Sequence, residues 1–90
     1  MDEYEYISVI KQFAGTYAPR GYAYCNGATL QIAHYQALFS LLGTRYGGDG
    51  QVTFKLPDLR EVVDGVPVPF QTSAKPGWII CVEGIYPERP

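Results

Sequence analysis

The sequence predicts a single α+β domain over residues 1–90, built from a small, mostly antiparallel sheet, one short helix and long ordered loops rich in glycine and proline. Ten glycines and seven prolines indicate many turns, and an aromatic content of 14% favours short strands. Only one segment has helical periodicity. A chain of 10.0 kDa has room for one core, and it is too short for a large fold with a concave active site.

Short apolar runs predict the strands. In the first run, Ile7, Val9 and Phe13 share one face, opposite Ser8 and Gln12. The last run is apolar on both faces, so we expect it to be the central strand. The predicted strands are residues 6–13, 21–25, 54–56 and 78–83.

The helix is predicted over residues 32–42, where Tyr35, Leu38 and Leu42 recur three or four residues apart. Gly43 follows, at the position of a C-terminal cap. The segment is apolar on most sides. A sheet or another subunit is therefore expected to cover it.

The loops are predicted from their glycines and prolines. The segment 43–53 is expected to be an ordered loop; it follows a helix, which is the wrong context for a phosphate cradle. A calcium loop needs several carboxylates at alternating positions, and this segment has only Asp49. Three prolines in residues 61–76 are expected to exclude regular strand pairing there.

Charge excludes further classes of protein. The net charge is −2, and the seven basic residues are scattered, so no nucleic-acid surface is expected. No apolar run is long enough to insert into a membrane. The acidic start at residues 1–5 has the wrong sign for a signal peptide. A cytoplasmic location is expected unless the protein is carried on a particle.

No catalytic or metal-binding constellation is visible, so an enzyme, a metal and a cofactor are not expected. His34 is the only histidine and lies at the start of the predicted helix, where a polar residue is ordinary. Cys25 has no orienting partner nearby in the sequence. Cys25 and Cys81 are either buried thiols or a disulfide that joins the first half of the chain to the last strand.

Two groups of side chains are candidates for binding or for loop fixation. Tyrosine and tryptophan suit binding surfaces, because they offer large flat faces with few rotors, although tyrosines also simply cover small cores. Arginines beside loops can fix them through carboxylates. The candidate ligand-binding residues are Tyr22, Tyr24, Tyr46 and Trp78. The candidate loop-fixing residues are Arg20, Arg45, Arg60, Asp49 and Asp58.

Three segments in order, residues 13–27, 35–50 and 53–60, resemble the phage tail collar domain of short tail fibres and of bacterial proteins labelled microcystin-dependent. Residues 78–90 are similar to the closing strand of longer bacterial members. The sequence departs from the family after Arg60, where Glu61–Asp64 replaces a Gly-Arg-Val-Pro motif. The long middle of full-length members is replaced by residues 61–76, and the chain has no His-x-His pair for an interchain metal.

The resemblance implies a non-catalytic structural or adhesion module that assembles with itself or with phage-tail-like components, in a virion or a tail-like particle. A homotrimer is expected over a monomer, with apolar surface around residues 66–70 buried between like subunits. The alternative is a small soluble module that binds a cell-surface glycan or a protein through exposed tyrosines.

Overall fold

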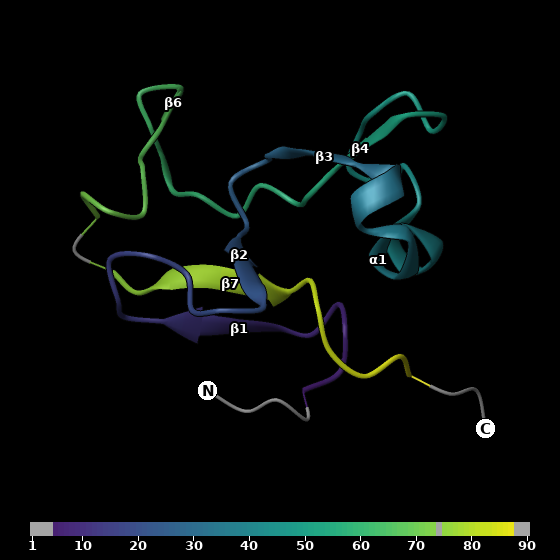
Figure 1. The fold of residues 1–90 in the computed structure, drawn as a ribbon. Coiled ribbons are helices and arrows are strands. Elements are labelled where there is room, and N and C mark those ends of the chain that lie inside the picture. Colours follow the sequence, from purple (N-terminus) through teal and green to yellow (C-terminus); the bar gives the residue numbers. More distant parts are fainter. Residues whose placement is uncertain (1–4, 74, 88–90) are drawn as a thin grey trace.

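The computed structural model describes residues 5–73 and 75–87, so most of the acidic start lies outside the described residues. Short strands pair antiparallel in three small sheets, and one helix lies at one side of the molecule, which confirms the α+β class (Figure 1). The elements are β1 (Ile10–Phe13), β2 (Tyr22–Tyr24), β3 (Thr29–Gln31), the 3-10 helix η1 (Ile32–His34), α1 (Gln36–Leu42), β4 (Thr53–Lys55), β5 (Val62–Val63), β6 (Val66–Pro67) and β7 (Gly77–Cys81).

The last strand is central, as predicted. The main sheet has the order β1-β7-β2, and both neighbours pair antiparallel to β7. Ile79 and Ile80 of β7 are fully buried although they point to opposite faces. This burial explains why the strand is apolar throughout, since both of its faces are covered.

Each face of this sheet has its own apolar cluster. Ile80 and Val82 belong to the larger cluster, which also holds Leu38 of α1 and Phe54 of β4. The expected packing of the helix against the last strand is therefore confirmed. The opposite face carries a smaller cluster of buried residues, namely Tyr22, Tyr24, Ile79 and Cys81.

The helix is shorter than predicted. Residues Ile32–His34 form a 3-10 turn, and Tyr35 interrupts the helical backbone with φ −137° and ψ 49° before α1 begins. Gly43 has a positive φ of 58°, and its N–H donates to the carbonyl of Phe39, which confirms the predicted C-terminal cap.

The first strand begins four residues later than predicted. Ser8 has a φ of 78°, which no strand allows, and regular pairing with β7 starts only at Ile10. Before this turn, the chain pairs with the segment that follows β7, where Tyr6 forms a parallel bridge with Ile85.

A second ladder pairs β3 with β4 and extends well beyond these short strands. Strand β3 was not predicted from the sequence, because Thr29–Gln31 is too short to show an alternating pattern. Backbone bonds continue the pairing in both directions, from Ile32 N–H to the Val52 carbonyl and from Leu59 N–H to the Cys25 carbonyl. Residues 25–32 thus run beside 52–59.

A third ladder, the β5–β6 hairpin, contradicts the expectation that prolines exclude pairing in residues 61–76. Asp64 and Gly65 form its two-residue turn with φ values of 53° and 80°. Val63 pairs with Val66, so the next pair, which contains Pro67, is one whose N–H groups point away from the ladder. Pro67 therefore removes no ladder hydrogen bond, and Val68 N–H resumes the pairing at the Glu61 carbonyl, 2.7 Å away.

Candidate functional site

The four candidate binding aromatics do not form one surface. Tyr22 and Tyr24 are each only 8% exposed, so the prediction that they are exposed binding residues is wrong. The loop after β6 brings Phe70 onto Tyr24, with ring centroids 5.3 Å apart, and the Tyr24 hydroxyl donates to the Gly15 carbonyl. Lys11 lies over the ring of Tyr22, with Nζ 4.9 Å from the centroid. These two tyrosines cover the core, which was the other reading of the sequence.

The other two aromatics differ in exposure. Trp78 is half-buried and packs against the larger cluster. Tyr46 is 40% exposed and lies in the loop between α1 and β4. Tyr46 is therefore the most accessible of the four candidates.

Asp49 fixes its loop through backbone groups and not through an arginine. Its Oδ1 accepts hydrogen bonds from the N–H groups of Gln51, Val52 and Thr53 at 2.9, 2.8 and 3.0 Å. These bonds, the one from Thr53 foremost, lower the pKa of Asp49 to about 2. The carboxylate therefore holds the turn that leads into β4.

Asp58 and Arg60 form the expected carboxylate–arginine pair. Arg60 donates from Nε to Oδ1 at 2.9 Å and from Nη2 to Oδ2 at 2.7 Å. The hydrogen bond from Arg60 lowers the pKa of Asp58 below its ordinary value. Arg20 and Arg45 are exposed and form no side-chain hydrogen bond or ion pair with the rest of the described chain. Among the residues that the structure describes, neither of these two arginines fixes a loop through its side chain.

The cysteines are buried and free. Cys25 belongs to the larger cluster and Cys81 to the smaller one, on opposite faces of the sheet, so the disulfide left open by the sequence does not form. Burial raises the pKa of Cys25 to about 12 and also raises the pKa of Cys81. Both thiols therefore stay protonated and behave as small apolar side chains.

Within the described ranges, no three His, Cys, Asp or Glu side chains gather in a group that could hold a metal ion. His34 is exposed at the end of η1. The helices in the part of the chain described here are also too short or too polar to cross a membrane.

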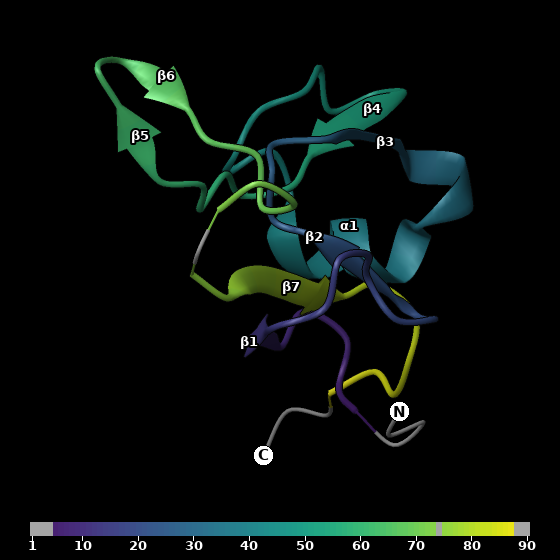
Figure 2. The same ribbon diagram turned by 90° about the vertical axis from the view of Figure 1, so that its left-hand side faces the viewer.

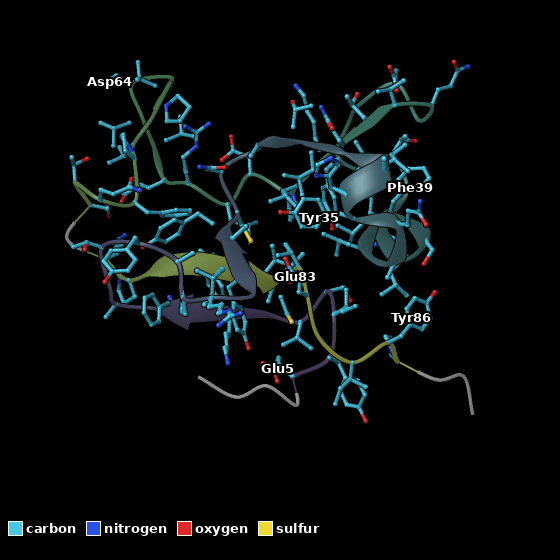
Figure 3. All side chains as sticks on the ribbon, viewed as in Figure 1. Glu5, Tyr35, Phe39, Asp64, Glu83 and Tyr86 are labelled. Carbon is cyan, nitrogen blue, oxygen red and sulfur yellow. The ribbon has the colours of Figure 1, made fainter. Side chains whose placement is uncertain are left out.

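The most prominent exposed apolar surface is the β5–β6 hairpin, which projects from the body of the molecule (Figure 2). Val62, Val63 and Val66 are 61%, 49% and 63% exposed, although they form its ladder. Asp64 lies at the tip (Figure 3). The sequence signal that was missed here is Asp-Gly between valines, a pattern typical of a two-residue hairpin.

A second exposed surface lies on the loop between α1 and β4, and we call it the loop surface. It consists of Arg45, Tyr46, Val52 and Lys55, all exposed. The Lys55 side chain lies along the loop backbone, since a Cβ on Gly47 would be 3.0 Å from Lys55 Cδ. The loop surface thus combines apolar area with two cations.

A third surface lies where the two ends of the described chain meet. Tyr6, Ile85, Tyr86 and Pro87 line an open hollow of about 430 Å³. Tyr86 reaches toward the helix, where its hydroxyl is 2.8 Å from Ser40 Oγ (Figure 3).

The family model of the phage tail collar domain matches residues 8–63, which is more than half of the chain. The match includes β1, β2, the β3–β4 ladder, α1 and the loop surface. The central strand β7 lies outside it, and it ends at Val63, inside the β5–β6 hairpin. No curated protein matches the chain.

Proposed function

The chain belongs to the phage tail collar domain family, a family of structural modules of phage tail fibres, and we propose from this membership that it acts as a non-catalytic assembly module of a phage tail or tail-like particle. In that role it associates with itself as a homotrimer, or with other tail components. Its location is then on the virion or on the tail-like particle.

One observation supports this proposal above the others, namely the three exposed valines of the β5–β6 hairpin. Val63 and Val66 share one face of the hairpin and Val62 lies on the other, and exposed apolar area on a small protein marks an interaction site. Ile79 and Ile80 of β7 and Phe54 of β4 are fully buried by the chain itself, whereas the valines of the hairpin remain open to a partner.

Magnitudes set a condition on such a contact. Covering the exposed halves of three valines contributes roughly 2–4 kcal/mol. A dissociation constant of 1 μM requires about 8 kcal/mol. The valines therefore nucleate the contact, and further apolar or charged surface must contribute to it.

Light scattering across a range of concentrations tests the proposal. We expect a mass three times that of the 10.0 kDa chain at micromolar concentration. A mass of 10.0 kDa at every concentration would contradict self-assembly.

Glycan adhesion is the second candidate, and the exposure of Tyr46 beside the exposed Arg45 favours it. A flat aromatic face suits sugar C–H groups, and a guanidinium suits sugar hydroxyls or acids. A glycan array probed with the native chain and with Tyr46→Ala tests it. Binding that Tyr46→Ala abolishes would support adhesion, and the absence of binding would favour the purely structural role.

A further inference from the structure

We propose that the β5–β6 hairpin of one copy docks, head to tail, on the loop surface of a second copy. This inference rests on the proposed self-assembly and names the two surfaces that carry it. It concerns residues that the chain itself leaves uncovered at two separate places.

The hairpin requires a cover for a physical reason. A two-stranded hairpin without a covering layer is marginal in water. Both faces of this ladder are open, because Val62 lies on one face and its neighbours Val63 and Val66 on the other, and all three remain about half exposed or more. An exposed apolar strand pair is a ready site for association.

The loop surface offers the matching apolar area. Tyr46 and Val52 are 40% and 61% exposed there. The loop is held in place, since Asp49 binds three backbone N–H groups and the N–H of Lys55 donates to the Gly47 carbonyl. A fixed surface loses little conformational freedom when it binds.

Charge selects the loop surface over the hollow at the chain ends. The hairpin segment 61–68 carries Glu61 and Asp64 and no basic residue. Glu61 lies 3.9 Å from Lys75 Nζ of its own chain, so Asp64 at the tip is the carboxylate of the hairpin without an ion pair in the described chain. Arg45 and Lys55 also have no ion pair within the described chain, so they are free to face Asp64. The hollow around Tyr86 is flanked in the chain by Glu5, which pairs with Lys11 at 3.1 Å, and by Glu83, whose charge would repel Asp64.

The geometry makes the contact heterologous. The hairpin and the loop after α1 lie apart from each other in both views (Figures 1 and 2), so one copy cannot satisfy its own pair. Two different surfaces on one chain generate a closed ring or an open filament. Each added copy presents one free hairpin and one free loop surface until the ring closes.

Two variants that each disable one surface test this arrangement. The hairpin variant is Val62→Thr with Val66→Thr, which keeps β-branched side chains, and the loop variant is Tyr46→Ser with Lys55→Gln. Tyr17→Ser is the control, because Tyr17 is 78% exposed and belongs to neither surface. Circular dichroism confirms the fold of each variant, and light scattering gives its mass.

We expect each surface variant alone to have the 10.0 kDa mass of a single chain and the control to keep the native mass. An equimolar mixture of the two surface variants is expected to form a complex of twice the chain mass, because one intact hairpin then meets one intact loop surface. A mixture that stays monomeric would overturn the head-to-tail contact.

Three other outcomes separate this inference from the proposed function. Surface variants that keep the native oligomeric mass would overturn the inference and leave self-assembly standing. A hairpin variant that is monomeric beside a loop variant that still assembles would overturn the loop surface as the acceptor. A native chain that is monomeric at every concentration would overturn self-assembly itself.

Discussion

The β3–β4 and β5–β6 ladders are both two-stranded and antiparallel, yet they differ in almost every other respect. Phe54 of β4 is fully buried against Phe39 of the helix, whereas Val66 of β6 is 63% exposed. Strand pairing is the same in both, so the difference lies in what covers them. A short ladder becomes part of a core only where another layer packs on it.

The largest expected effect on stability comes from removing the side chain that packs the β3–β4 ladder against α1. Phe54→Ala leaves a cavity under α1 and should lower the free energy of unfolding by about 3–5 kcal/mol, a large part of the 5–15 kcal/mol (roughly) that a domain has in total. Val66→Ala is the matched control and should change it by less than about 0.5 kcal/mol in the monomer. Urea unfolding measures both. Equal losses would show that the two ladders are covered alike.

The next largest difference is expected between glycine substitutions beside the two ladders, in the stability that each one costs. Gly48 has a φ of 97°, and a Cβ there would lie 2.4 Å from Phe54 Cα, so Gly48→Ala combines backbone strain with overpacking. We expect Gly48→Ala to lower the free energy of unfolding by about 2–4 kcal/mol. Gly65→Ala in the hairpin turn meets nothing within 4 Å and carries only the strain of its positive φ, about 1–2 kcal/mol. Thermal unfolding compares the two, and a smaller loss for Gly48→Ala would contradict the close approach.

Acid should loosen the first ladder in a defined range of pH. The pKa of Asp49 falls from 3.8 to about 2 on folding, so its stabilisation is complete above pH 3.8 and is lost as the pH falls toward about 2. The protection of the Gln51, Val52 and Thr53 amides, that is, how much slower they exchange than in an unstructured peptide at the same pH, should fall over that interval. Asp49→Asn keeps an acceptor oxygen but does not titrate, so its exchange should lack this acid step. If the protection of these amides in the native protein did not change with acid, the result would argue against the three hydrogen bonds.

The smallest expected difference is between the amide exchange rates of the two ladders in the native protein, and it needs no substitution. In dilute solution, amide exchange of Phe54 in β4 should be slow, because the amide opens only when the core opens. Exchange of Val63 and Val66 should be fast, since their hairpin is open on both faces. Comparable protection of the two ladders in a monomer would show that the hairpin is stable by itself.

Local rules predicted the parts of the fold that local chemistry decides. The central strand over 78–83 and the cap at Gly43 follow from apolar content and from glycine's freedom at positive φ. The hairpin was not predicted, because proline was expected to disrupt a strand at any position. Whether it does depends on the register, and Pro67 falls at a position where no ladder N–H is needed. The turn signal in Asp64–Gly65 was the stronger one.

The candidate site depended on contacts that no local rule contains. Tyr22 and Tyr24 look like surface aromatics in sequence, but they belong to a buried cluster on which Phe13, Ala18 and Phe70 pack, and Phe70 is more than forty residues away in the chain. In the same way, Asp49 was expected to meet an arginine, but the turn that follows it offers three N–H groups closer at hand. Exposure and partner choice are tertiary properties.

Cross-linking between copies identifies directly which surface of a second copy covers the hairpin. Val66→Cys and Val52→Cys proteins are mixed under oxidising conditions, while Cys25 and Cys81 remain buried and protonated. We predict a disulfide between the two different variants, seen as a species of twice the 10.0 kDa chain mass that neither variant forms alone. Cross-linking of Val66→Cys protein with itself, or of neither, would contradict it.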